Sequence, residues 1–217
     1  MTNTNHFTFT QGVNLIGGGS VNEQDINDII KSGKNLFCAD SGLNYALENN
    51  LVVSGLIGDL DSVGSQKDAP YPVLFDQSQD TNDLEKSLNA IKAKYIICYG
   101  FLGGRIDHSL ASFNVISKLK QIAFLIGEKD ICVVCPKYLK LNLPIGTRLA
   151  LFPMDETLGK SKGLKWDLDG ILLSPKGRIS TSNENVEENV EIWIDDGLAL
   201  AIFPRKILPK IINQWPF

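Results

Sequence analysis

Short, uniformly apolar runs recur up to about residue 136 and alternate with stretches of helical period. Because these runs lack the one-sided alternation of a half-exposed strand, they predict strands buried on both faces, most of them parallel. The runs are VNLIGG, NLFCAD, SGLIGD, YPVLFD, AKYIICYG, IAFLIGE and ICVVCP. Strands that alternate with helices in this way indicate an α/β sheet.

Three of the intervening stretches place apolar residues at helical spacing, and the first of them ends at a glycine, Gly33. We expect the apolar face of each helix to pack against the sheet. The positions are Ile26, Ile29 and Ile30 in NEQDINDIIKSG, Leu84, Leu88 and Ile91 in NDLEKSLNAIKAK, and Ile106, Leu110 and Phe113 in RIDHSLASFNVISKLK.

The pattern changes after residue 140, where short segments are separated by Gly, Pro, Asn and Asp and show no helical period. Segments such as GTRLALFP, NVEIWIDDG and LALAIFP are typical of an all-β unit. The sequence therefore predicts an N-terminal, mostly parallel α/β domain over residues 1–138 and a C-terminal β-sandwich over residues 139–217.

Composition narrows the classes of partner. The chain has 217 residues, 43% hydrophobic and 21% charged, with a net charge of −4. This acidic balance argues against a nucleic-acid partner. No apolar run reaches the ~18 residues that cross a bilayer, and MTNTNHFTFT lacks the features of a signal peptide. We expect a cytoplasmic protein with no membrane partner.

The cysteines favour the same compartment. Cys132 and Cys135 form a C-x-x-C motif within a β-branched run, and the chain has only two histidines. A zinc site needs further ligands, and a thioredoxin-type motif begins a helix. We therefore interpret this motif as part of a core strand.

Polar residues gather where the predicted strands end. Asp59 and Asp61 are two residues apart in LIGDLDSV, which in an extended chain puts them on one face with Cα atoms about 6.5–7 Å apart. Such a pair either holds a divalent metal ion or belongs to a solvated turn. Four strand ends carry acidic residues, and the carboxyl ends of parallel strands share one edge, so metal binding is favoured. The segments are ADSG, GDLDS, DQSQDTND and FLGGRIDHS.

Arg105 stands between a glycine pair, Gly103 and Gly104, and the start of a predicted helix. Glycines let a phosphate approach the backbone, a helix start offers free N–H groups, and arginine binds phosphate through two hydrogen bonds. Beside acidic residues suited to Mg²⁺, this combination predicts a site for a magnesium–nucleotide complex. The P-loop motif is absent from the sequence. Thr81 and Asp83 also fit the start of a helix, as cap and first-turn residue.

Together these segments resemble the thiamine pyrophosphokinase family. The family's recurring pieces are A-D-[SG]-G, G-D-x-D-S, D-Q-x-x-T-D-[FL]-x-K and G-G-R-x-D-H. They correspond here to ADSG (39–42), GDLDS (58–62), DQSQDTNDLEK (76–86) and GGRIDH (103–108), followed by GLKWDL (163–168) and STSN (180–183). The six pieces occur in the family's order and span most of the chain.

The resemblance implies an enzyme that transfers pyrophosphate from ATP to the hydroxyl of thiamine, giving thiamine diphosphate and AMP. It also implies a homodimer in which thiamine lies between one subunit's α/β domain and the other's β domain. The implied roles are Mg²⁺ binding for Asp59, Asp61 and Asp83, with Asp40 nearby; contacts to the nucleotide or its phosphates for Ser62, Gln77, Thr81, Gly103, Gly104 and Arg105; support of that loop for Asp107 and His108; and thiamine contacts for Ser182 and Asn183.

Two departures from the family pattern bear on these roles. Asn82 is inserted before Asp83, and Ser112 stands where the family often has asparagine. Trp166 fits either a thiamine contact or a core position. The alternative functions are a metal-dependent nucleotide-sugar glycosyltransferase, whose D-x-D also binds metal, and a non-catalytic regulator that binds thiamine or a nucleotide.

Overall fold

The structure, a computed structural model, describes residues 7–59, 69–78 and 80–217. The chain divides into two compact units, Met1–Gly127 and Glu128–Phe217. Asp61 and Ser62 lie outside the described residues. The elements of the first unit are β1 (Phe7–Thr8), β2 (Val13–Ile16), α1 (Glu23–Ser32), β3 (Leu36–Ala39), α2 (Gly42–Glu48), β4 (Val53–Gly58), β5 (Val73–Phe75), α3 (Asp83–Ala90), β6 (Ile91–Lys92), β7 (Ile96–Tyr99), α4 (Ile106–Lys118) and β8 (Ala123–Ile126).

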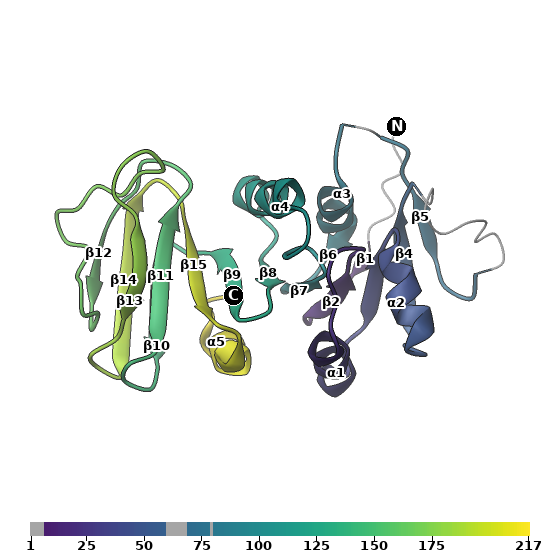
Figure 1. Cartoon of the computed structure of the whole chain (residues 1–217), viewed down its shortest axis with the longest axis horizontal. Coiled ribbons are helices and arrows are strands. Elements are labelled where there is room, and N and C mark those ends of the chain that lie inside the picture. Colours follow the sequence, from purple (N-terminus) through teal and green to yellow (C-terminus); the bar gives the residue numbers. More distant parts are fainter. Residues whose placement is uncertain (1–6, 60–68, 79) are drawn as a thin grey trace. The chain divides into compact units, whose positions relative to one another are not determined.

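Six parallel strands form the sheet of the first unit, in the order β8-β7-β2-β3-β4-β5. The chain adds strands outward from β2 on one side and later from β7 on the other, so the direction of winding reverses between β2 and β7 (Figure 1). Helix α1 covers one face of the sheet, and α3 and α4 cover the other (Figure 1). The predicted α/β class is confirmed.

Helix ends in this unit follow local side-chain chemistry. Asn22 and Asp25 form a reciprocal capping box at the start of α1, and Gly33 ends that helix in a left-handed conformation with φ 59°. In α3 the cap is Asn82, whose side chain accepts the N–H of Glu85 at 2.9 Å. The inserted residue therefore takes the capping position that the sequence also allowed for Thr81.

Two predicted helix faces are not fully buried. In α1, Ile26 and Ile29 are buried but Ile30 is 58% exposed. Ile106 and Leu110 of α4 are 77% and 62% exposed, although their spacing predicted burial against the sheet. The helix instead buries Ser112, Val115 and Ile116. Periodicity identified the helix, but it did not identify which of its sides this chain covers.

The second unit contains two antiparallel sheets, β13-β11-β15-β9 and β10-β14-β12. In β14, buried residues alternate with exposed or half-buried ones, which is the pattern of a sheet covered on one face. The predicted β-sandwich is confirmed. Its elements are β9 (Asp130–Val134), β10 (Tyr138–Asn142), β11 (Arg148–Pro153), β12 (Leu158–Lys162), β13 (Ser180–Glu184), β14 (Asn189–Asp196), β15 (Ala199–Pro204), η1 (Arg205–Ile207) and α5 (Leu208–Gln214).

Strand β9 contains Cys132 and is followed directly by Cys135; it pairs antiparallel with β15, within the second unit. Cys132 and Cys135 are buried, and this burial raises the pKa of each thiol to about 12. Such thiols stay protonated and behave as small apolar side chains.

None of the helices in the described part of the chain has the length and apolar character of a membrane span.

Candidate functional site

A cavity of about 610 Å³ lies in the first unit, beyond the carboxyl ends of β2, β3 and β7. This is where the strand order reverses, the usual ligand position in open α/β sheets. Residues that follow each of the three strands, together with the starts of α3 and α4, line the cavity. They are Gly18, Gly19, Ser20, Asp40, Ser41, Tyr45, Asn82, Asp83, Leu84, Gly100, Phe101, Gly103, Gly104, Arg105, His108, Ala111 and Ser112.

The glycine of the ADSG segment permits a close approach between two elements. A Cβ atom at Gly42 would lie 2.2 Å from the carbonyl oxygen of Ile16, so only glycine allows α2 to begin this near the end of β2. Tyr45 of the same helix donates a hydrogen bond to the carbonyl of Gly19 at 2.9 Å. These contacts hold the loop after β2 against the start of α2.

Asp40 has the backbone and side-chain features of a residue kept for a ligand. It is 8% exposed and adopts φ 43°, a left-handed conformation that non-glycine residues rarely occupy. Its Oδ1 atom is buried and has no hydrogen-bond partner among the described residues. A buried carboxylate oxygen without a partner is costly, and this oxygen fits a role as a metal or ligand contact.

The carboxylates of Asp40 and Asp59 lie near enough to Asp83 for their negative charges to act on it. Burial raises the pKa of Asp83 above its ordinary value, and the carboxylates of Asp40 and Asp59 raise it further, while Lys86 and His108 oppose this shift. Like charges gathered in this way favour a bound cation. Among described residues, no group of three His, Cys, Asp or Glu side chains is placed to hold a metal ion, and Asp61 lies outside that part of the chain.

Lys86 is a charged residue of this site to which the sequence prediction gave no role. Its side chain is 2% exposed, and its Nζ lies 3.9 Å from Oδ2 of Asp59. Lysine is rarely buried without a charged partner. The signal was present in the lysine of DQSQDTNDLEK, three residues after Asp83 and therefore on the same side of α3.

The GGRIDH segment forms the opposite wall. Gly103 and Gly104 have φ values of 81° and 78°, which turn the chain into α4. Arg105 donates two hydrogen bonds to Asp107, from Nε at 3.1 Å and Nη2 at 2.5 Å. This pairing raises the pKa of Arg105 and lowers that of Asp107. The side chains are 71% and 63% exposed, so the guanidinium is accessible at the cavity rim.

Several predicted residues do not line this cavity. They are Asp59, Gln77, Thr81 and Asp107. Gln77 is exposed after β5, and Thr81 precedes the cap of α3. The structure therefore brings Asp40, Asp83, Gly103, Gly104, Arg105 and His108 together around one cavity.

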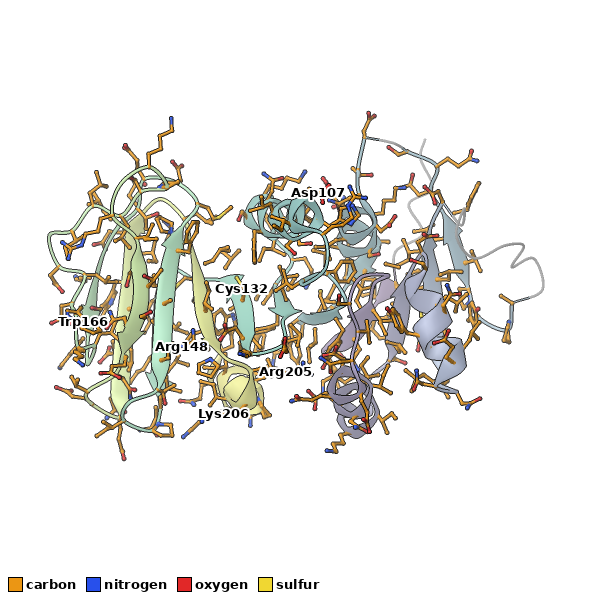
Figure 2. The ribbon with its side chains drawn as sticks, in the orientation of Figure 1. Asp107, Cys132, Arg148, Trp166, Arg205 and Lys206 are labelled. Atoms are coloured by element: carbon orange, nitrogen blue, oxygen red, sulfur yellow. The ribbon has the colours of Figure 1, made fainter. Side chains whose placement is uncertain are left out.

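The second unit has its own cavity, of about 280 Å³, beside β13. Trp166, Ser182 and Asn183 all line it. Trp166 is 54% exposed, so it is not a core residue; Figure 2 labels it in the second unit, and Asp107 at the start of α4 in the first. Ser182 is exposed with φ 58°, whereas Asn183 is 2% exposed.

An open α/β sheet with a cavity at its switch point, together with a β-sandwich that has a cavity of its own, defines a two-unit protein whose first cavity lies where such sheets bind ligands. Comparison with known families agrees. Residues 26–126 match the family model "Thiamin pyrophosphokinase, catalytic domain", and residues 135–199 match "Thiamin pyrophosphokinase, vitamin B1 binding domain". Together the two matches cover more than half of the chain. The chain belongs to the thiamin pyrophosphokinase family.

Individual relatives point the same way. The chain is 32% identical over 171 residues to Thiamine pyrophosphokinase 1 of Oryza sativa subsp. japonica, a match that covers 68% of this chain and 65% of the relative. It is 28% identical to Thiamine pyrophosphokinase 1 of Arabidopsis thaliana, covering 82% and 81%. The match therefore spans somewhat less than two thirds of the rice relative.

Solved structures support the fold. Thiamine pyrophosphokinase from Bacillus subtilis superimposes with a TM-score of 0.74 at 19% identity, covering 89% of this chain and 99% of that one. Yeast thiamin pyrophosphokinase gives 0.72 at 19% identity, covering 94% and 89%. At these identities the likeness concerns the fold.

Proposed function

We propose that this protein transfers the pyrophosphoryl group of ATP to the hydroxyl of thiamine, giving thiamine diphosphate and AMP. The observation that carries the proposal is that each of the two matched family domains falls on a unit with its own cavity. The hydroxyl oxygen of thiamine forms a bond to the β-phosphorus of ATP and its proton passes to solvent. The bond from that phosphorus to the α,β-bridging oxygen breaks, and AMP leaves with that oxygen.

Mg²⁺ fits the carboxylate wall of the first cavity. Asp59, Asp61 and Asp83 would hold the ion, and Asp40 supplies a buried oxygen without a hydrogen-bond partner among the described residues. The donor set consists of carboxylate oxygens, which Mg²⁺ prefers. When bound, the ion would neutralise charge on the transferred phosphates. Lys86 keeps a positive charge beside Asp59 and so limits the repulsion among these carboxylates.

The opposite wall would bind the nucleotide phosphates. Arg105 offers a planar pair of donors, and α4 begins directly after this loop with no side-chain cap hydrogen bond from Arg105, so N–H groups of its first turn are proposed as phosphate contacts. Asp107 holds the guanidinium at the rim through two hydrogen bonds. We assign Gly103 and Gly104 to close backbone approach and His108 to support of the loop. Ser62 is kept as a predicted nucleotide contact, whereas Gln77 and Thr81 do not line the cavity and are assigned no contact here.

Thiamine would occupy the second cavity. Its thiazolium ring is a cation, and an aromatic ring attracts cations. Lys165 Nζ already lies 4.8 Å from the centroid of the Trp166 ring, so thiamine would use the other face of the indole. Ser182 offers a hydroxyl at the cavity wall. Under this proposal the α/β unit, Met1–Gly127, binds Mg-ATP, and the β unit, Glu128–Phe217, binds thiamine; the sequence prediction had set the boundary between residues 138 and 139.

We also propose a homodimer in which the thiamine cavity of one subunit serves the ATP cavity of the other. Ile106 and Leu110 support this arrangement, because two large apolar side chains are exposed on α4 beside the cavity residues Arg105 and His108. A cytoplasmic location suits the four buried, free cysteines.

One assay tests the proposed activity. The protein is incubated with Mg-ATP and thiamine, and the products are separated by chromatography. We expect AMP and thiamine diphosphate in equal amounts. Either a nucleotide-sugar glycosyltransferase or a non-catalytic regulator would yield neither product, and that result would reject the proposal.

A further inference from the structure

The side chain of Asn183 is bound to peptide groups on two segments of the chain. Its Oδ1 accepts the N–H of Trp166 at 3.2 Å and the N–H of Glu184 at 2.9 Å. Its Nδ2 donates to the carbonyl of Trp166 at 2.7 Å. A carboxamide has two donor hydrogens and two acceptor lone pairs, so three of the four are engaged in a residue that is 2% exposed.

These side-chain bonds extend the backbone pairing between the segment before Trp166 and the end of β13 by one further residue. The segment before Trp166 pairs with the end of β13 through Lys165 N–H to the carbonyl of Glu184 and Val186 N–H to that of Gly163, both at 2.9 Å. Pairing of β13 with β11 is then irregular, since Leu149 faces Asn183 but Leu151 faces Ser180. Ser182, within this irregular stretch, has φ 58°. In place of a backbone partner, the Asn183 carboxamide gives Trp166 one acceptor and one donor, as a peptide group does.

The ring of Trp166 is also held. The Nζ of Lys165 lies 4.8 Å from the indole centroid, and the same Nζ is 2.7 Å from Oε1 of Glu184. The indole is therefore fixed through its backbone by Asn183 and on its face by a tethered lysine. It remains 54% exposed and lines the cavity.

We infer that Asn183 is a positioning residue, which fixes Trp166 in the wall of the second cavity and acts on thiamine only through that tryptophan. The inference rests on the proposed function of this cavity, and it replaces the direct thiamine contact that the family resemblance implied for Asn183.

Asn185 supplies a matched control. It is 1% exposed, two residues further along, and it also bonds only to peptide groups, accepting from Thr147 N–H and donating to the carbonyls of Leu143 and Glu187. None of these residues lines the second cavity. Asn185→Asp therefore removes a buried carboxamide and its hydrogen bonds, but it changes no bond to Trp166.

Steady-state kinetics test the role. In Asn183→Asp the donor to the Trp166 carbonyl is lost and a charged oxygen takes its place. We expect the KM for thiamine to rise roughly tenfold, as expected when one buried hydrogen bond is lost, with the KM for ATP unchanged. Asn185→Asp should lower the melting temperature and leave both KM values unchanged. If Asn183→Asp does not fold, Asn183→Ser takes its place.

A double-mutant cycle with Trp166→Ala separates positioning from direct contact. If Asn183 acts through the indole, Asn183→Asp changes the KM for thiamine less than about twofold in the Trp166→Ala background. The same tenfold rise in both backgrounds would mean that Asn183 touches thiamine itself, and the inference would be wrong.

Fluorine NMR of protein labelled with 5-fluorotryptophan gives a readout independent of activity. Without any ligand, Asn183→Asp should shift or broaden the Trp166 resonance, while Asn185→Asp leaves it in place. An unmoved Trp166 resonance would overturn the inference. If the wild-type protein makes no thiamine diphosphate, the proposed function fails, yet this spectrum still decides whether Asn183 positions Trp166.

Discussion

The two cavities differ in whether a buried polar side chain in the wall has its hydrogen bonds satisfied. In the α/β unit, Asp40 Oδ1 has no hydrogen-bond partner among the described residues, and the neighbouring carboxylates raise the pKa of Asp83. In the β unit, the side chain of Asn183 makes three hydrogen bonds to peptide groups. In the first cavity a buried carboxylate oxygen, Asp40 Oδ1, is left for a ligand to contact. In the second cavity the buried carboxamide of Asn183 is bonded to the backbone of the cavity wall. Lining a cavity is therefore not enough to assign a ligand contact, because hydrogen-bond satisfaction separates the two roles.

The largest expected effect concerns the carboxylates of the first cavity. Asp83→Asn removes one of several clustered carboxylates, so we expect turnover to fall at least about 100-fold with no loss of melting temperature, because a repulsive charge disappears. EDTA should abolish the wild-type activity in the same way. Glu48→Gln, at an exposed position of α2, is the control and should change neither quantity.

An active Asp83→Asn would show that the carboxylate is not needed for turnover, and one that unfolds would show that it stabilises the fold; either result would contradict the comparison. Calorimetry beside the product assay distinguishes these outcomes.

The second prediction asks whether one active site uses both cavities from different subunits. We expect Asp83→Asn and Trp166→Ala each to have little activity as homodimers. After subunit exchange, a heterodimer contains one site with both defects and one with neither. Activity should return to roughly half of the wild-type value per heterodimer if sites are independent. A mixture that stays inactive, with exchange verified by differently tagged subunits, would place each site within one chain.

The third prediction concerns the rim of the first cavity. Arg105→Lys keeps the charge but loses the planar pair of donors, so we expect the KM for ATP to rise roughly tenfold and the KM for thiamine to stay constant. Stability should not change, because the side chains of Arg105 and Asp107 are largely exposed. Arg148→Lys, in an Arg–Asp pair with Asp130 in the second unit, is the control. Equal ATP kinetics in wild type and Arg105→Lys would remove the phosphate role.

Sequence patterns explain the position of the first cavity in physical terms, whereas the residues predicted for the second cavity came from the family resemblance. In a parallel sheet, the strand ends are set by the apolar runs, so Asp40, Asp83 and Arg105 are placed near one another by topology alone. The glycine pair before Arg105 is equally readable, since both residues need positive φ. Lys86 was in the sequence too, but burial of its charge depends on Asp59 in another strand–loop segment.

All three residues predicted for the second cavity line it, but their individual roles could not be predicted, because the contacts there are irregular. An asparagine offers the same donors and acceptors to thiamine and to a peptide group, so the sequence cannot assign Asn183 to either. The irregular register at Ser182 depends on pairing with β11, a strand about thirty residues away. The predicted burial of Ile106 and Leu110 was wrong for a related reason. Helical periodicity shows which residues share one face of a helix, but it does not show what covers that face.

The smallest expected effect tests whether backbone strain is kept for function in both cavities. Among the described residues, Asp40, Asn50 and Ser182 are the non-glycine residues with positive φ, and two of the three line a cavity. Ser182→Gly relieves the strain at φ 58°, and we expect the free energy of unfolding to rise by about 0.5 kcal/mol after the entropy gained by the unfolded chain is subtracted. Loss of the hydroxyl should raise the KM for thiamine about threefold to tenfold. Ser182→Ala keeps the strain and should show only the change in KM.

Asn50→Gly is the matched control for this last prediction, since Asn50 has φ 52° at an exposed turn after α2. Its stability change should be smaller, because asparagine tolerates the left-handed conformation better than serine does, and the KM for thiamine should not move. Denaturant unfolding and thiamine kinetics measure both quantities. If Ser182→Gly gains stability and keeps its KM, the strained serine follows from the register of β13 alone, and strain at Asp40 loses its value as a sign of ligand binding.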